Sequence, residues 1–184
     1  MRWKLIFVFL AINALIVLFV VRNKRGVACR AYSDVNVFCV KPDVERQLFF
    51  AMIRDGDADA AYKLGRHLNF AVEDAKDGYE LAIICNLIAA LQGHHNACQG
   101  LRAGIKDIRR LLLTSKAPND GFRLNDELQL QFFNFYWRLL GGVIMKNDMA
   151  IREMQNGLAG LGVHAKLFDA DKISALLKGD ACLP

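Results

Sequence analysis

Apolar residues recur at helical spacing along most of the chain beyond residue 43, and short polar or glycine-containing stretches separate one apolar stripe from the next. In one stripe Ala60, Ala61, Leu64 and Leu68 share a helix face, and Asp57 stands where it can cap that helix. Similar stripes predict further helices over residues 44–53, 79–91, 96–114, 148–159 and 170–178. The pattern therefore predicts an all-α domain whose helices are joined by short connections.

The most apolar of the predicted helices begins at Asn125 or Asp126, either of which can act as its N-cap. A helix that is apolar around most of its circumference is buried. We therefore expect this helix to be central, with Gly141 and Gly142 loosening its end. Its apolar side chains cover two faces, with Leu128, Phe132, Phe135 and Leu139 on the first and Phe133, Tyr136 and Trp137 on the second.

A different apolar pattern occupies the start of the chain. The 17 residues at positions 5–21 carry no charge, and basic residues flank them on both sides. A helix of this length spans about 26 Å, close to the roughly 30 Å hydrocarbon core of a bilayer. This predicts one N-terminal transmembrane helix, so we divide the chain into a membrane anchor (1–25), a short extended segment (26–42) and a helical domain (43–184). A cleaved signal peptide is the alternative, although the run ends in basic rather than small residues.

Cysteine spacing indicates on which side of the membrane the domain lies. Cys29 and Cys39 are ten residues apart in a polar stretch, which suits a local disulfide in an oxidising compartment; two unrelated thiols are the alternative. Cys85 and Cys98 lie within apolar helical patterns and are expected to fill the core. This spacing favours a domain that faces the periplasm or the cell exterior. We place the chain at the bacterial inner membrane, crossed once, with the domain facing the periplasm.

The distribution of charge argues against nucleic acid as the partner. The formal net charge is +5, but residues 1–25 hold five Lys or Arg and no acidic residue, so the remainder is neutral. This basicity belongs to the flanks of the predicted anchor, where it meets lipid headgroups. Within the remainder, acidic residues gather between positions 55 and 80, and basic residues gather between positions 102 and 116.

These segregated charges supply the candidate partner-binding residues. The four basic members recur at helical spacing and form one stripe. Complementary charge helps two partners to meet and to orient, so we predict a docking surface for a protein; a solvated helix face is the simpler alternative. The candidates are Asp55, Asp57, Asp59, Arg66, Asp74 and Asp77 on one side, and Arg102, Lys106, Arg109 and Arg110 on the other.

Two motifs resemble a known repeat family. GDADAAYKLG (residues 56–65) has small residues and a Leu-Gly pair in a first helix, and AALQGHHNA (residues 89–97) has an Ala-Ala-x-x-Gly end to a second. Over about one degenerate repeat the chain resembles the Sel-one-like repeat, an α/α-hairpin relative of the tetratricopeptide repeat. Asp57 and Asn96 stand 39 residues apart, a period typical of such units. The resemblance implies a short array of α/α hairpins, although Cys85 and Asn86 replace the usual aromatic pair.

The resemblance implies a non-catalytic protein-binding module held at the membrane. Small envelope proteins similar to this family include immunity proteins, so we expect neutralisation of a secreted antibacterial toxin, such as a phospholipase, in the periplasm. A scaffold or regulator of a cell-envelope complex is the alternative of the same class. An envelope hydrolase using His94 or His95 is the alternative of another class, but adjacent helical residues point about 100° apart. We expect no metal and no cofactor.

Overall fold

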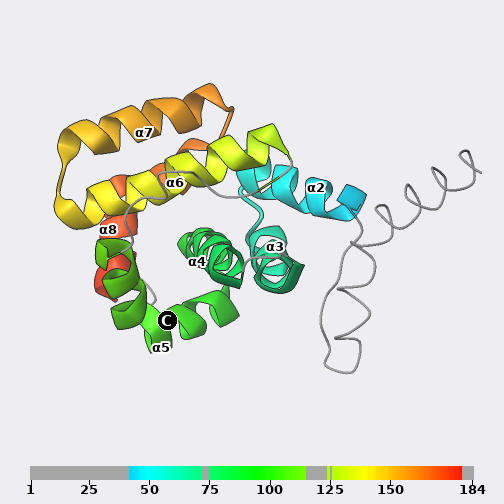
Figure 1. Ribbon diagram of the computed structural model, residues 1–184, viewed down its shortest axis with the longest axis horizontal. Helices are drawn as coiled ribbons and strands as arrows, with labels where there is room; N and C mark the ends of the chain where they lie inside the picture. Colours follow the sequence, from blue (N-terminus) through cyan, green and yellow to red (C-terminus); the bar gives the residue numbers. More distant parts are fainter. Residues whose placement is uncertain (1–41, 72–74, 115–123, 125, 180–184) are drawn as a thin grey trace, which may run out of the picture. The chain divides into compact units, whose positions relative to one another are not determined.

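The computed structural model describes residues 42–71, 75–114, 124 and 126–179, and every regular element in these ranges is helical. They belong to the unit Val40–Pro184, whereas Met1–Cys39 form a second unit that lies outside the described residues. The predicted all-α class is confirmed for the described part of the chain (Figure 1). The elements are α2 (Pro42–Phe50), the π-helical turn η1 (Ala51–Asp55), α3 (Ala58–Ala71), α4 (Ala75–Leu91), α5 (His95–Thr114), α6 (Glu127–Met145), α7 (Asp148–Gly160), the 3-10 turn η2 (Ala165–Phe168) and α8 (Ala170–Lys178).

Helix α2 begins at Pro42, two residues before the predicted start. Proline suits the first helical position, because its φ is already helical and the N–H that it lacks has no partner there. Asp43 and Glu45 follow in the first turn, where negative charge interacts favourably with the helix dipole. Pro42 therefore belongs to the helix rather than to the predicted extended segment, whose other residues, 26–41, lie outside the described part.

Helices α3 and α4 pack against each other as a hairpin. The stripe of Ala60, Ala61, Leu64 and Leu68 is buried as predicted. The backbone N–H of Ala60 donates to Oδ1 of Asp57 at 3.0 Å, so Asp57 is a cap of α3. Both the stripe and the cap were predicted from residue types alone, and both are confirmed.

The α3–α4 crossing is closest at Gly65. A Cβ at this position would lie 2.9 Å from Cβ of Cys85 and 3.3 Å from the carbonyl oxygen of Ala82. Only a residue without a side chain lets the two helices approach this far. Gly65 therefore provides the room that the helix crossing needs.

Helix α4 starts at Ala75, four residues earlier than predicted. Asp77 and Gly78 stand in its first turn and do not precede it. One glycine costs a helix about 1 kcal/mol, which the burial of an almost wholly apolar helix outweighs. The helix is buried from Leu81 onward, with Asn86 and Leu91 only half-buried.

Helix α5 follows a tight turn at Gly93, whose φ is 85°. Leu101, Ile108 and Leu112 are buried, and Ile105 is half-buried. One face of α5 therefore packs on the domain, and the opposite face is exposed.

Helix α6 is central, as predicted. Oδ1 of Asp126 accepts the backbone N–H groups of Leu128 and Gln129 at 3.0 and 3.2 Å, so Asp126 is its N-cap. The Tyr136 hydroxyl, which is buried, donates to the carbonyl oxygen of Leu167 at 2.7 Å. The second predicted face is buried at Phe133, Tyr136 and Trp137. The first is buried at Phe132 and Leu139 and half-buried at Leu128 and Phe135, and Leu140, which belongs to neither face, is also buried.

The end of α6 differs from the prediction. The helix continues through Gly141 and Gly142 to Met145 before α7 returns along it (Figure 1). A Cβ at Gly142 would lie 3.3 Å from a side-chain carbon of Ile151 in α7. The glycine therefore serves close helix packing and does not end the helix.

The C-terminal elements close the domain on its first helices. The backbone N–H of His164 donates to the carbonyl oxygen of Ile53 at 2.7 Å, which joins the segment after α7 to η1. Oδ1 of Asp169 caps α8 by accepting the N–H groups of Asp171 and Lys172. Helix α8 then packs against α4, α5 and α6.

Among the described residues, none of the helices combines the length and the apolar character that crossing a bilayer requires. The predicted anchor at residues 5–21 and the predicted Cys29–Cys39 disulfide lie outside the described residues.

Candidate interaction surface

The exposed side of α5 carries four cationic side chains, Arg102, Lys106, Arg109 and Arg110, which we call the basic face. Their spacing places them on neighbouring turns of one helix surface, because the buried residues of α5 hold the opposite surface against the domain. All four are exposed, as the sequence pattern predicted.

One acidic side chain interrupts the basic face. Oδ1 of Asp107 lies 3.7 Å from a terminal nitrogen of Arg110, and both side chains are more than 70% exposed. An ion pair this exposed contributes little to stability, since water screens it. The face therefore keeps a positive potential that an acidic surface can meet.

The acidic candidates do not form a matching face. Asp57 is used as the cap of α3, and Asp59 lies 3.2 Å from His94. Asp55 is exposed at the end of η1, and Arg66 is exposed on α3. Asp74 lies outside the described residues, and Asp77 stands in the first turn of α4. Two of these residues thus have local structural partners.

His94 joins the beginnings of α3 and α5. Its Nδ1 accepts the backbone N–H of Ala97 at 3.2 Å, which caps α5. A neutral imidazole that accepts at Nδ1 carries its proton on Nε2, so Nε2 donates to Oδ1 of Asp59 at 3.2 Å. The ring also stacks on Tyr62, with centroids 4.3 Å apart and planes 24° apart. These contacts occupy both ring nitrogens and one ring face.

His95 makes a different contact. Its Nε2 lies 2.9 Å from Nε2 of Gln99, on the exposed surface of α5. The two histidines therefore have separate partners and do not share a ligand position. Across the described residues, no group of three or more His, Cys, Asp or Glu side chains is placed to hold a metal ion.

His94→Ala is expected to lower the free energy of unfolding by about 1–2 kcal/mol, because it removes a helix cap and an aromatic contact. His95→Ala is the matched control and is expected to change stability by less than about 0.5 kcal/mol, as at other exposed sites. Urea unfolding followed by far-UV circular dichroism measures both values. Equal effects of the two substitutions would contradict the capping role, and loss of a hydrolytic activity with the fold intact would favour the hydrolase alternative.

One polar contact and one buried thiol lie inside the domain. His67, only 4% exposed, lies with Nε2 3.0 Å from Oε2 of Glu45, which joins α3 to α2. Burial raises the pKa of the free Cys85 thiol, and burial together with the nearby Cys85 raises the pKa of Tyr136. Both groups therefore stay protonated at neutral pH, so Cys85 is a core residue, as predicted, and a poor nucleophile.

A groove between α6, α7 and α8 was missed by sequence reasoning. It has a volume of about 500 Å³ and is open to solvent. Charged and polar side chains line most of it, including Arg152 of α7 and Asp171 of α8. Met145 and Met149, which are 64% and 81% exposed, stand at the nearby α6–α7 corner. Methionine is enriched in protein interfaces, so this corner is a second candidate contact surface.

Comparison of the chain with protein-family models, curated proteins and solved structures found no match. The resemblance to the Sel-one-like repeat therefore stays a prediction from the two motifs.

Proposed function

We propose that the chain is a non-catalytic protein-binding module, and that it acts as an immunity protein against a secreted antibacterial toxin. The observation that carries this proposal is the basic face of α5, where four cations are exposed on one helix surface. Such a surface suits an acidic partner, because complementary potentials speed encounter and fix orientation.

The arrangement of caps supports a repeat-like scaffold for this surface. Asp57 caps α3 through the N–H three residues later, and His94 caps α5 in the same way. The two caps are 37 residues apart, two fewer than the 39 predicted from Asp57 and Asn96, and within the range of helical-hairpin repeats. Stacked hairpins commonly present binding surfaces for proteins.

The membrane and periplasmic parts of the proposal depend on the sequence of residues 5–21. An anchor there holds the helical domain beside the membrane, where a secreted phospholipase finds its substrate. Neutralisation then consists of covering the toxin's active site, and it requires no chemistry from this chain.

A scaffold or regulator of an envelope complex is the second candidate. The presence of two separate candidate surfaces favours the scaffold. The groove near Met145 and Met149 lies at the start of α8, whereas the basic face lies on α5. A scaffold must bind two partners at once, whereas an immunity protein needs one. A toxin gene beside the gene for this chain supports immunity, and its absence favours the scaffold.

Binding of the partner is expected to fall about 10-fold or more in the variant Lys106→Glu/Arg109→Glu, since like charges then oppose each other. The control Arg138→Glu/Lys166→Glu reverses two exposed charges on α6 and η2, with the same change in net charge, and is expected to leave binding intact. The full-length chain in mild detergent serves as bait, and captured proteins are identified by mass spectrometry and then titrated.

The identity of the captured protein separates the two candidates. A toxin whose killing of bacteria is prevented by co-expression of the chain, but not of the Lys106→Glu/Arg109→Glu variant, supports immunity. A structural envelope protein supports the scaffold. If the Lys106→Glu/Arg109→Glu variant captures the same protein as the wild type, α5 is not the binding surface. Raising the ionic strength should weaken binding that depends on the basic face.

A further inference from the structure

The groove between α6, α7 and α8 is lined by two basic and two acidic side chains. Lys146 ends α6 and Arg152 stands in α7, whereas Asp148 begins α7 and Asp171 stands in the first turn of α8. All four are exposed, and none of them forms an ion pair with another described residue. The groove therefore presents equal numbers of positive and negative charges that can pair with charges of another molecule.

The α6–α7 corner, residues 145–149, stands beside this groove at the edge of the domain (Figure 1). Its Met145 and Met149 are the two most exposed large apolar side chains in the described part of the chain. Lys146 and Asp148 lie between them, so the corner carries one positive and one negative charge beside two apolar side chains. Methionine is enriched in protein interfaces, where such side chains become covered. The corner therefore has the composition of a contact surface.

Backbone hydrogen bonds hold the corner in one conformation. Lys146 is left-handed, with φ at 54°, and its N–H donates to the carbonyl oxygen of Val143 at 3.3 Å. The N–H of Asn147 donates to the carbonyl oxygen of Gly142 at 2.9 Å, and Oδ1 of Asn147 accepts the N–H of Ala150 at 3.1 Å. A surface that is already ordered loses little conformational entropy when it binds. The corner is therefore pre-organised to enter a groove.

The corner and the groove are complementary between two copies of this chain. In a dimer with two-fold symmetry, the corner of each copy meets the groove of the other, so every contact occurs twice. Lys146 and Asp148 belong to the corner, whereas Arg152 and Asp171 belong to the helices beside it. Lys146 of one copy then pairs with Asp171 of the other, and Asp148 pairs with Arg152. The groove has a volume of about 500 Å³, which leaves room for the methionine side chains of the corner.

We infer that two copies of this chain associate through this groove, each placing its α6–α7 corner in the groove of the other. Both exposed methionines are then covered, and the four charges of each groove and corner find opposite charges. The inference goes beyond the proposed function, because it assigns the groove to a second copy and leaves the basic face of α5 to the partner.

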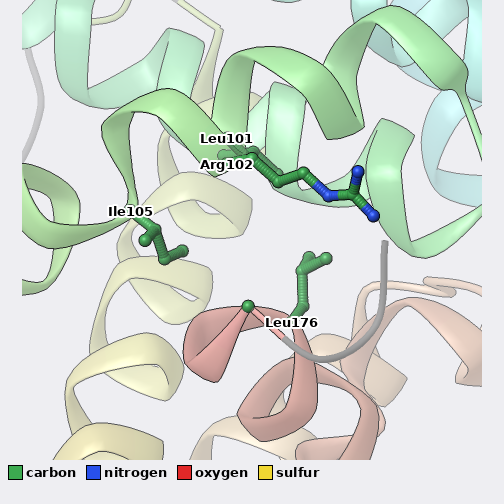
Figure 2. Close-up of a pocket in the computed structure, with 5 residues that line it drawn as sticks. Leu101, Arg102, Ile105 and Leu176 are labelled. Carbon is green, nitrogen blue, oxygen red and sulfur yellow. The ribbon is translucent and has the colours of Figure 1, made fainter. Parts of the chain in front are cut away.

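The basic face lies at the other end of α8 from this groove. There Leu176 and Gly179 of α8 line a crevice together with Arg102 of the basic face (Figure 2). The crevice has a volume of only about 10 Å³, so it holds no ligand larger than a water molecule. The groove is at the start of α8, and a nine-residue helix is about 13 Å long. The dimer therefore presents two basic faces outside its contact.

Sedimentation equilibrium of the full-length chain in density-matched mild detergent tests the association. A concentration-dependent equilibrium between monomer and dimer is expected. Lys146→Asp and Asp171→Arg each oppose like charges twice in the dimer and are expected to raise its dissociation constant about 10-fold or more. Aspartate tolerates the left-handed conformation at position 146, so the first substitution keeps the corner. The control Asp55→Arg reverses an exposed charge at the end of η1 and is expected to leave the constant unchanged.

An equimolar mixture of the Lys146→Asp and Asp171→Arg variants separates a contact between copies from one within a chain. In the mixed dimer both contacts join opposite charges again, so the dissociation constant is expected to return to within about 3-fold of the wild-type value. Mixing cannot restore a charge pair that lies within one chain. A chain that stays monomeric up to about 100 μM, a dimer that both variants leave intact, or a mixture without recovery would overturn the inference. So would a monomer whose capture of an envelope protein is lost in Asp171→Arg, because the groove then holds a different protein.

Discussion

Replacing Phe132 by alanine is expected to lower the free energy of unfolding by about 3–5 kcal/mol, the usual cost of removing a fully buried aromatic ring. Phe132 has no exposed surface and stands at the centre of a group of aromatic rings. Its ring centroid lies 5.4 Å from Phe49, 5.1 Å from Phe133 and 5.7 Å from Tyr136. The substitution therefore leaves a cavity between α2 and α6 that rigid neighbours cannot fill.

Phe132→Leu is the matched variant, because leucine keeps most of the side-chain volume and loses the ring contacts. We expect it to lower the free energy of unfolding by about 1–1.5 kcal/mol. Urea unfolding of the full-length chain in mild detergent, followed by tryptophan fluorescence, measures both values. Trp137 in α6 is buried and reports on this region. If Phe132→Ala does not fold, the leucine variant still tests the prediction, and a loss below about 0.5 kcal/mol there would contradict tight packing around Phe132.

Gly65→Ala is expected to lower the free energy of unfolding by about 3 kcal/mol, the upper end of the range for overpacking a core. The added Cβ meets Cβ of Cys85 at 2.9 Å and the backbone oxygen of Ala82 at 3.3 Å, and neither atom can move without moving α4. The helices α3 and α4 must therefore separate along their whole contact.

Gly100→Ala is the control for helix propensity. Gly100 lies within α5, and nothing stands within 4 Å of a Cβ built there. This substitution is expected to stabilise the chain by about 0.5–1 kcal/mol, because alanine favours the helix. Urea unfolding is expected to show a lower free energy of unfolding for Gly65→Ala and a higher one for Gly100→Ala. Changes in the same direction would contradict the close crossing.

The helices and their caps could be predicted from the sequence because both depend on nearby residues. Asp57 and Asp126 cap helices as expected, since a carboxylate next to free backbone N–H groups needs no distant partner. The stripe around Leu64 is buried for a similar reason, because its helical spacing is visible within a few turns. The exposure of the basic face could be predicted from the same helical spacing.

The positions of glycines within or outside helices were predicted less well, because the effect of a glycine depends on tertiary contacts. The predicted helix 79–91 left Gly78 out, and Gly142 was expected to loosen the end of a helix, yet both glycines stand inside helices. At Gly142 the reason is the approach of Ile151 from α7, which no local pattern reveals. At Gly65 the reason is the approach of Cys85 and Ala82 from α4.

The bond at Cys98 and the groove near Met149 were missed for a related reason. Cys98 is disulfide-bonded, whereas the apolar residues around it indicated a core thiol. A disulfide cannot be recognised from the residues that surround one of its cysteines. The groove is formed by three helices, and the incorrect end of α6 placed Met145 in an expected connection. Surfaces assembled from several elements need the fold before they can be recognised.

The hydrogen bond from His164 to Ile53 has a consequence for biosynthesis. Its two residues are separated by 111 positions, and the ring contact between Phe49 and Phe132 spans more than 80. A ribosome therefore delivers the first helices long before the groups that cover them exist. Contacts this distant slow folding and leave apolar surface open to aggregation in the meantime. The first helices therefore keep apolar surface exposed until the last third of the chain has been synthesised.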